Sequence, residues 1–197
     1  MKKYAITGGI ASGKSTFSRL IKSMNLPFVD CDALVRDAYE KGGHIYEAVV
    51  KTFGLSILDA SGDVDRKRLG ELVFSSSEAR KQIDDVTHPI VKALVEKELE
   101  KFEAAGEAHV FVDIPLLFET KAESQYDASI LIDTDEALQI KRLMRRNRLK
   151  REAAIARIQA QMPLGEKRKK ATYIITNNAT LEDFIQRSEE LLQKLLK

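Results

Sequence analysis

The feature that most constrains this chain is a glycine-rich segment, GGIASGKST at residues 8–16, which stands between an apolar run and an amphipathic stretch. Residues 8–15 fit the pattern G-x-x-x-x-G-K-[ST] at every fixed position. The run YAIT at 4–7 before the segment predicts a buried strand. After the segment, apolar residues recur at the spacing of a helix face, at Phe17, Leu20, Ile21 and Met24. The chain is therefore expected to open with a strand, a phosphate-binding loop and a helix.

The residue types of this loop suit the binding of phosphate groups. Glycines let the backbone turn tightly and direct its N–H groups inward, and the start of the following helix adds a partial positive charge. Lys14 can neutralise the β- and γ-phosphates of a nucleotide, and the hydroxyl of Ser15 can ligate Mg²⁺. The residues expected to contact the nucleotide here are Gly9, Ile10, Ala11, Ser12, Gly13, Lys14, Ser15 and Thr16. The motif indicates a nucleoside triphosphate, but it does not identify the acceptor of the phosphate.

Short apolar runs alternate with longer helical patterns along the rest of the chain. Further strands are predicted at 28–30, 109–113, 129–133 and 173–177. Helices are predicted at 135–147, about 150–162 and 181–196. Strands that alternate with helices favour a parallel sheet with both faces covered. We therefore expect an α/β fold of the P-loop NTPase type, with a five-stranded parallel sheet flanked by helices.

Residues 32–106 depart from this alternation because they carry helical patterns and no convincing strand. Within this segment, His88 and Pro89 are expected to interrupt a helical pattern. The segment is too long for a simple crossover between strands, so it predicts a helical subdomain inserted beside the sheet. A length of 197 residues suits one domain with a proper core. We therefore expect a single domain over 1–197 that includes this insert, which offers room for a second substrate.

Composition narrows the class of protein. The chain is 44% hydrophobic and 31% charged, which is ordinary for a globular protein, and no apolar run approaches the length of a membrane span. The N-terminal residues lack the apolar stretch of a secretory signal. The single cysteine, Cys31, cannot form an internal disulfide, and we interpret it as structural. A cytoplasmic protein with no membrane association and no obligate protein partner is expected.

One stretch is strongly basic, although the whole chain carries a net charge of only +2. In KRLMRRNRLKR at 141–151, seven of eleven residues are Lys or Arg. A solvated helix face is one interpretation. Nucleic-acid binding is a second, but the aromatic side chains that would stack on bases are missing there, and we expect no nucleic-acid partner. Contact with the phosphates of a nucleotide is a third.

A pair of aspartates follows the second predicted strand, in the segment FVDCDALVR at 28–36. Ligands of a doubly wound sheet bind at the carboxyl ends of its strands, so Asp32 is expected in the same crevice as the phosphate loop. Its carboxylate can accept the proton of an acceptor hydroxyl or orient that hydroxyl for attack, although it can equally cap the following helix. Arg36 lies one helical turn later and can hold an anionic group of the acceptor. Together with the helical insert, these residues favour a small-molecule kinase.

Six segments stand in order along nearly the whole chain: TGGIASGKS at 7–15, VDCDALVR at 29–36, THPIV at 87–91, DIPLLFE at 113–119, ARIQAQMPLGEK at 156–167 and YIITNNATLEDF at 173–184. Together they resemble the dephospho-coenzyme A kinase family, which phosphorylates the 3′-hydroxyl of the ribose of dephospho-coenzyme A. The segment at 113–119 is the most specific to that family. Two departures are visible. Cys31 stands where alanine is usual, and Thr176 and Ala179 replace the Asp and Gly of a D-N-x-G pattern, which affects the loop beside the adenine.

The resemblance implies ATP and dephospho-coenzyme A as substrates and assigns roles to single residues. Asp32 becomes the catalytic base or orienter, assisted by Lys14 and Arg142. The acceptor-binding residues that it implies are Asp32, Arg36, His88, Pro115, Leu116, Leu117 and Glu119. His88 is either a pocket-lining or a structural histidine, and the two leucines are either site or core residues.

The resemblance also implies a helical lid over 139–165. This leaves a core of 1–31, 107–138 and 166–197 and an acceptor-binding subdomain of 32–106. Arginines on one face of a lid can close over the β- and γ-phosphates and exclude water.

The same resemblance guides the prediction of the residues that contact the nucleotide. The arginines expected to reach ATP are Arg142, Arg146 and Arg157. Asn177 is expected beside ATP as well. Mg²⁺ is the expected cofactor, held by Ser15 and by Asp113, which ends a strand where P-loop enzymes often keep a carboxylate on the magnesium side.

Two other functions remain compatible with the sequence. A nucleoside, nucleotide or other small-metabolite kinase would share the loop, the lid and the insert, and only the segments at 28–36, 87–91 and 113–119 separate it. A regulatory nucleotide switch would hydrolyse its nucleotide slowly without a soluble acceptor. The N-K-x-D pattern of many GTP switches is absent from the chain.

Overall fold

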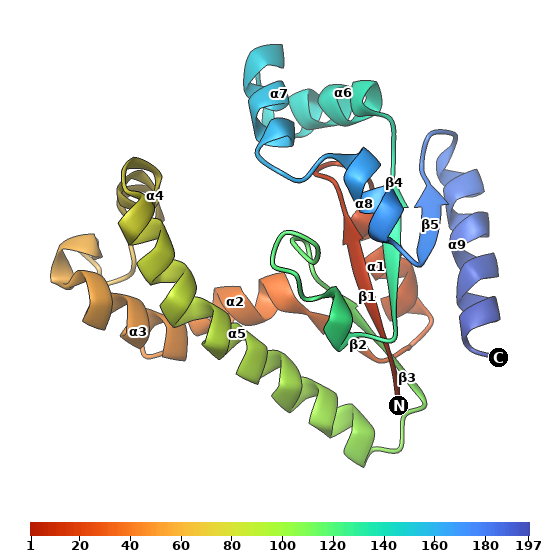
Figure 1. Cartoon of the computed structure of the whole chain (residues 1–197), viewed down its shortest axis with the longest axis horizontal. Coiled ribbons are helices and arrows are strands. Elements are labelled where there is room, and N and C mark those ends of the chain that lie inside the picture. The colour runs from red at the N-terminus through yellow and green to blue at the C-terminus, as the bar shows by residue number, and fades with distance from the viewer. The chain divides into compact units, whose positions relative to one another are not determined.

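The computed structural model describes all 197 residues, which divide into two compact units (Figure 1). Unit 1 consists of residues 1–29 and 102–197, and unit 2 of residues 30–101. The strands are β1 (Lys2–Gly8), β2 (Phe28–Asp30), β3 (His109–Asp113), β4 (Ala128–Asp133) and β5 (Tyr173–Thr176). The helices are α1 (Lys14–Ser23), α2 (Cys31–Ala38), α3 (His44–Phe53), α4 (Arg66–Ser75), α5 (Ser77–Ala104), α6 (Glu136–Asn147), α7 (Arg151–Gln159), α8 (Leu164–Lys170) and α9 (Leu181–Leu195).

The strands form one five-stranded sheet in the order β2-β3-β1-β4-β5. The central strand β1 pairs in parallel with both β3 and β4, and β4 pairs in parallel with β5. In this register Ile6 stands opposite Asp113 on one side and Ile130 on the other. The carboxyl ends of β1, β3 and β4 therefore lie at the same edge of the sheet, which is the edge from which the phosphate loop leaves.

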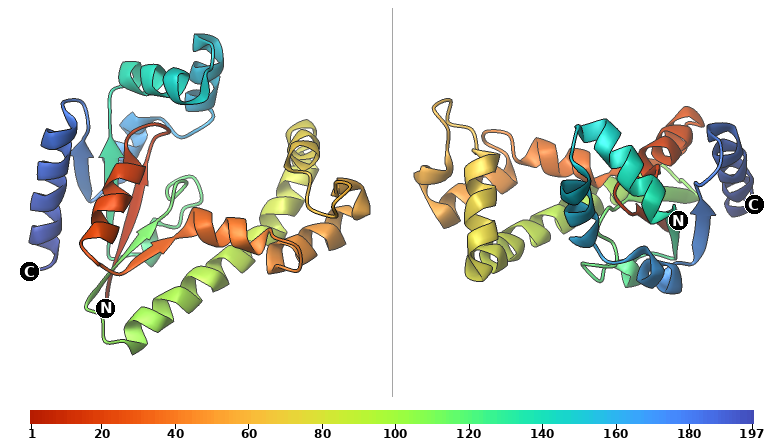
Figure 2. Two further views of the ribbon diagram at one scale, coloured as in Figure 1. Left: turned by 180° about the vertical axis from the view of Figure 1, so that it is seen from behind. Right: turned by 90° about the horizontal axis from the view of Figure 1, so that it is seen from above.

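Unit 1 buries both faces of this sheet. Helices α1 and α9 cover one face, and α8 lies on the other (Figure 2). The larger core cluster joins strand residues such as Ile6 and Phe111 to Phe17 of α1 and Phe184 of α9. On the opposite face Ala5 packs with the buried residues that follow β3. A strand buried on both faces needs a continuous apolar run, which explains why the sequence pattern locates these strands well.

Unit 2 is helical, with its own smaller core. Buried residues from α3 and the following turn, including Ile45, Val49 and Ile57, pack with Leu69 of α4 and with half-buried residues of α2 and α5. Between α3 and α4, an isolated antiparallel bridge joins Leu58 to Val64, and no strand forms there. The prediction of a helical segment without a strand is therefore confirmed.

Helix α5 differs from the sequence prediction at Pro89, which we expected to interrupt the helical pattern. The helix continues through Pro89 from Ser77 to Ala104. Proline removes one backbone hydrogen bond from the helix. Its apolar neighbours Val86 and Ile90 pack against the core of unit 2 and hold the backbone in place.

The other elements lie close to their predicted ranges, with one exception. Helix α8 was not predicted, because its sequence LGEKRKK offers a single large apolar residue and no helical pattern. It lies across the predicted boundary between lid and core at residue 165. None of the helices combines the length and the apolar character that crossing a bilayer requires.

Candidate nucleotide-binding site

The phosphate loop connects the end of β1 at Gly8 to the start of α1 at Lys14. Gly13 has φ 106°, a left-handed conformation that side chains rarely adopt, and a Cβ atom there would lie 2.1 Å from Asn177 Nδ2. Glycine is therefore required at this position for two independent reasons. No side chain caps the N-terminus of α1, and its first turn holds no acidic residue. The N-terminus thus keeps its partial positive charge for an anionic ligand.

Lys14 and Asp113 form an ion pair at the carboxyl ends of β1 and β3. The other carboxylate oxygen of Asp113 accepts a hydrogen bond of 2.8 Å from Ser18 Oγ on α1. Asp113 is almost fully buried, so these two partners replace the contacts with water that its side chain loses. A triphosphate bound in the loop would compete with Asp113 for the ammonium group of Lys14. The structure thus brings a predicted phosphate ligand next to the predicted magnesium-side carboxylate.

Arg142 and Asn177 meet on the opposite side of the loop. The guanidinium group of Arg142 donates to the carbonyl oxygen of Asn177 at 3.0 Å, and Asn177 Nδ2 donates to the carbonyl oxygen of Ser12 at 2.7 Å. Thr134, which follows β4, donates its hydroxyl hydrogen to the same Asn177 carbonyl at 2.9 Å. The segments after β4 and β5 are therefore tied to the phosphate loop through Asn177. Sequence reasoning missed Thr134, although a threonine directly after an apolar strand was a usable signal.

The other two predicted arginines do not join this network. Arg146 donates to the side chain of its neighbour Asn147 at 2.9 Å and is exposed. Arg157 is exposed on α7. Their contact with ATP stays a prediction.

The segment after β3 places its residues in different environments. The carbonyl oxygen of Pro115 accepts a hydrogen bond of 3.1 Å from Thr7 Oγ1, which fixes the segment to β1. Leu116 is 45% exposed, whereas Leu117 is fully buried in a cluster with Ala5. Leu117 thus packs in the core under the sheet in this structure, and its role in acceptor binding stays a prediction.

Glu119 ends this segment and contacts residues on both sides of the predicted boundary between lid and core at residue 165. Its Oε1 atom accepts a hydrogen bond of 3.0 Å from the backbone N–H of Met162. The same oxygen lies 2.7 Å from Nζ of Lys167 on α8, a lysine that is fully buried. The role of Glu119 in acceptor binding stays a prediction, and the contacts themselves connect the segment after β3 to the segment after α7.

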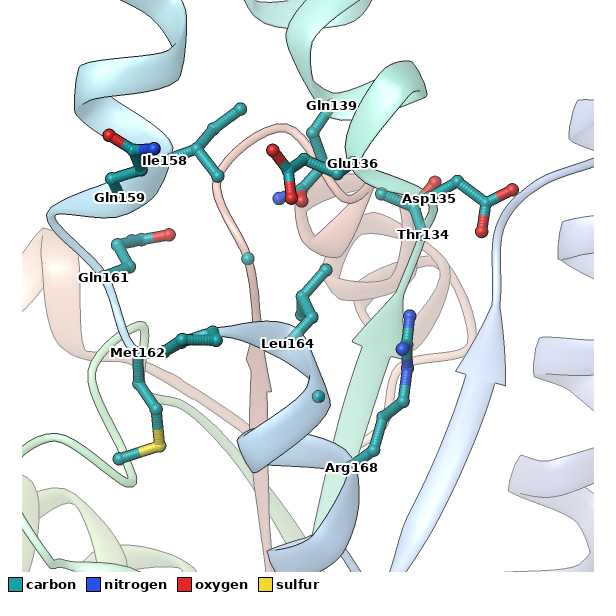
Figure 3. A pocket seen from close by; sticks show the side chains of 13 residues that line it. Thr134, Asp135, Glu136, Gln139, Ile158, Gln159, Gln161, Met162, Leu164 and Arg168 are labelled. Carbon is teal, nitrogen blue, oxygen red and sulfur yellow. The ribbon is translucent and has the colours of Figure 1, made fainter.

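A cavity of about 480 Å³ opens beside Gly9 at the carboxyl ends of β1 and β4 (Figure 3). It is lined by Gly9, Thr134, Asp135, Glu136, Gln139, Ile158, Gln159, Gln161, Met162, Pro163, Leu164, Gly165 and Arg168. Nε of Arg168 donates to Oδ2 of the buried Asp133 at 2.9 Å, and this hydrogen bond raises the pKa of the arginine above its ordinary value. The cavity thus has a charged floor and walls from α6, α7 and α8.

The remaining predicted residues belong to unit 2. Asp30 caps α2, because its side chain accepts a hydrogen bond of 3.0 Å from the N–H of Ala33. Asp32 therefore does not carry the capping role that the sequence left open, and it lies exposed in the first turn of the helix. Arg36 is also exposed, 3.6 Å from Asp37 Oδ1. The ring of His88 is exposed on α5, 3.6 Å from Asp84.

The donor set available to a metal ion is sparse. No group of three or more His, Cys, Asp or Glu side chains is arranged to hold a metal. Mg²⁺ characteristically keeps water ligands and takes one or two protein oxygens besides the phosphates of a nucleotide. Ser15, which is exposed in the first turn of α1, and Asp113 therefore fit a magnesium ion that arrives with a nucleotide.

Comparison with known proteins decides the family. A family model described as dephospho-CoA kinase matches residues 4–183, which is most of the chain. The chain belongs to the dephospho-CoA kinase family. Members of this family are kinases that phosphorylate dephospho-CoA to CoA in the last step of CoA biosynthesis. The family predicted from the six sequence segments is thus confirmed.

Individual dephospho-CoA kinases agree with this assignment. The enzyme of Listeria innocua is 45% identical over 181 residues, which cover 92% of this chain and 90% of the relative. The solved dephospho-CoA kinase of Campylobacter jejuni is 34% identical, with a TM-score of 0.75, and the match covers 99% of this chain and 98% of that one. A solved Thermus thermophilus protein is 37% identical with a TM-score of 0.85, over 98% and 97% of the two chains. The predicted P-loop NTPase fold is therefore confirmed.

Proposed function

We propose that this chain transfers the γ-phosphoryl group of ATP to the ribose 3′-hydroxyl of dephospho-CoA, which gives CoA and ADP. The observation that carries the proposal is the arrangement around the phosphate loop. An uncapped helix N-terminus, Lys14 and the buried carboxylate of Asp113 meet at one edge of the sheet. Membership of the dephospho-CoA kinase family supports the identity of the acceptor.

The nucleotide would be held by the backbone of the phosphate loop and by Lys14. Backbone N–H groups at the start of α1 and the ammonium group bind the phosphates and stabilise the charge that develops during transfer. Arg142 is already fixed beside the loop by Asn177, which supports a contribution to the same end of the nucleotide. Arg146 and Arg157 lie on the helices of the lid and are proposed to approach the phosphates when ATP is bound.

Ser15 and Asp113 would hold Mg²⁺ with the bound nucleotide. The ion supplies neutralisation of charge on the β- and γ-phosphates. Ser18 keeps the carboxylate of Asp113 oriented through its hydrogen bond, so that one oxygen remains directed toward the loop side of the strand.

For the acceptor, we propose that Asp32 accepts the proton of the attacking hydroxyl or orients that hydroxyl. As the P–O bond to the acceptor forms, the hydroxyl proton goes to the Asp32 carboxylate and the bond to ADP breaks. The exposed residues Arg36, His88 and Leu116, with Pro115 and Glu119, are the proposed acceptor-binding residues. The assignment of the capping role to Asp30 supports this role for Asp32, because it removes the main competing explanation.

The test follows ADP and CoA together in a reaction with ATP, Mg²⁺ and dephospho-CoA. The wild-type protein should form the two products one for one, since each transfer consumes one ATP. Asp32→Ala should lower turnover by about two orders of magnitude or more, which is typical of a lost acid–base group, and should keep its affinity for ATP.

Asp85→Ala is the matched control, because Asp85 is an exposed carboxylate of the same unit and should leave turnover unchanged. If ADP forms no faster with dephospho-CoA than without it, the proposed acceptor is wrong. A panel of nucleosides and other small alcohols then becomes the next set of substrates to test.

A further inference from the structure

The backbone of one residue in the phosphate loop, Ile10, is hydrogen-bonded on both sides by glutamine side chains. The N–H of Ile10 donates to Oε1 of Gln161 at 2.8 Å. The carbonyl oxygen of Ile10 accepts from Nε2 of Gln139 at 2.7 Å. Both distances are those of good hydrogen bonds. The peptide groups on either side of Ile10 are therefore oriented by side chains from outside the loop.

The two glutamines come from opposite ends of the predicted lid. Gln139 lies in the first turns of α6, and Gln161 lies two residues beyond the end of α7. Figure 3 shows both side chains at the cavity, Gln139 on α6 and Gln161 on the segment that follows α7. Because α6 and α7 pack against each other, the lid contacts the loop as one piece. Apolar contacts support the hydrogen bonds, since Ile10 and Ala11 pack against the buried residues of the α6–α7 pair.

These hydrogen bonds act on a strained turn. Ala11 has φ 60°, a left-handed conformation that is sterically unfavourable for a residue with a Cβ atom such as alanine. The carbonyl group that Gln139 binds belongs to the peptide bond between Ile10 and Ala11, so its orientation is tied to that turn. Gly9 is constrained as well, because a Cβ atom there would lie 2.4 Å from Nε2 of Gln139.

Burial makes these contacts conditional on the position of the lid. Gln139 is only 2% exposed. A buried amide that loses its partner pays a desolvation cost. Moving α6 and the segment after α7 away from the loop would release both peptide groups of Ile10 at once. The orientation of the loop N–H groups that follow Ile10 is thereby coupled to the seating of the lid.

We propose that Gln139 and Gln161 are positioning residues, which set the backbone of the phosphate loop for nucleotide binding only when the lid is packed against it. The inference rests on the proposed function in one respect, namely that this loop binds ATP. Neither glutamine needs to touch the nucleotide. Both act through the peptide groups of Ile10 and the turn at Ala11.

The first experiment measures nucleotide affinity directly, by calorimetry with ATP and Mg²⁺ in the absence of an acceptor. Gln161→Leu should weaken ATP binding by about three- to tenfold, the equivalent of one neutral hydrogen bond. KM for ATP should rise by a similar factor, whereas KM for dephospho-CoA should not change. Gln186→Leu is the matched control, because Gln186 is an exposed glutamine of unit 1 whose side chain bonds to Glu190 on the same helix. It should bind ATP as the wild type does.

A second variant separates positioning from a merely structural role. Ala11→Gly in the Gln161→Leu background should restore much of the ATP affinity, because glycine adopts the left-handed turn without strain. Amide hydrogen exchange should show loss of protection at Ile10 in Gln161→Leu and not in the control.

The outcomes are distinguishable. Unchanged ATP affinity in both Gln161→Leu and Gln139→Leu would overturn the inference and leave the proposed function intact. A loss of affinity that matches the loss of thermal stability, with no rescue by Ala11→Gly, would also overturn it. If the wild-type protein itself does not bind ATP, the proposed function is wrong.

Discussion

Lys167 shows how one charged residue can hold two segments together. Its side chain is fully buried on α8, and its ammonium group pairs with Glu119, which also accepts the N–H of Met162. Removing one partner of such a pair leaves an uncompensated charge in a poorly solvated place, whereas replacing both can be nearly neutral. The pair therefore joins the segment after β3 to the segment after α7 at the level of single atoms.

Glu119→Gln should lower the free energy of unfolding by about 3 kcal/mol, because the ammonium of Lys167 loses its counter-charge. The double variant Glu119→Gln with Lys167→Met should recover most of this loss, since the amide that replaces the Glu119 carboxylate can still accept the N–H of Met162. Urea denaturation of the two variants provides the measurement. A double variant as unstable as the single one would show that the ion pair is not the source of the effect.

Measurement of KM for dephospho-CoA tests the proposed role of Glu119 in acceptor binding separately from its role in stability. If Glu119 binds the acceptor directly, the double variant keeps a raised KM even with its stability restored.

Among the helices, α5 contains the residue with the lowest helix propensity, Pro89, in its interior. Proline inside a helix costs about 3 kcal/mol relative to alanine, and part of this is offset because proline also restricts the unfolded chain. Pro89 is exposed, so little packing is lost when its ring is removed. Pro89→Ala should therefore raise the free energy of unfolding by about 1–2 kcal/mol, measured by urea denaturation.

The same variant tests the predicted role of the segment at 87–91. If His88 and Pro89 form part of the acceptor site, the stabilised variant should lose affinity for dephospho-CoA while it keeps its affinity for ATP. A lower free energy of unfolding in Pro89→Ala would contradict the explanation of the helix cost. An unchanged affinity for dephospho-CoA would contradict the role of His88 and Pro89 in acceptor binding.

Prediction from sequence succeeded for elements that carry a recognisable apolar pattern within their own residues. The strands of unit 1 are buried on both faces, so their apolar runs are continuous and easily located. Helix α8 escaped prediction because its one buried residue is the charged Lys167, whose partner Glu119 lies 48 positions away along the chain. The break expected at Pro89 was wrong for a similar reason. Packing of Val86 and Ile90 in unit 2 overrides the local preference of proline.

The candidate site divides in the same way. The phosphate loop follows from its motif, because the glycines and Lys14 are adjacent in sequence. The contacts of Gln139 and Gln161 with Ile10 could not be predicted, since they require the α6–α7 pair to fold back onto a loop about 130–150 residues earlier in the chain. Leu117 was assigned to the site through the family resemblance of the segment at 113–119, which does not reveal that this side chain is fully buried in the core.

At the scale of the whole molecule, the division into two units separates the proposed roles. Every residue proposed to bind ATP belongs to unit 1, whereas Asp32, Arg36 and His88 belong to unit 2. Each unit has its own hydrophobic core. Binding of a nucleotide should therefore be measurable through the stability of the chain without any contribution from Asp32.

MgATP at about one hundred times its dissociation constant should stabilise the folded chain by about 2.7 kcal/mol. For a chain of this size, that corresponds to a rise of roughly 5–10 °C in Tm, measured by scanning fluorimetry. Asp32→Ala should show the same rise, because it changes unit 2 alone. Lys14→Met should abolish the rise, although its baseline Tm will also fall because Asp113 loses its partner. The variants must therefore be compared by the rise in Tm that MgATP causes, and not by their absolute Tm values.

Chelation of Mg²⁺ by EDTA should reduce the rise in Tm that ATP causes in the wild-type protein, since the β- and γ-phosphates then lose part of their neutralising charge. A shift that survives in Lys14→Met would mean that the stabilising nucleotide is bound somewhere other than the phosphate loop.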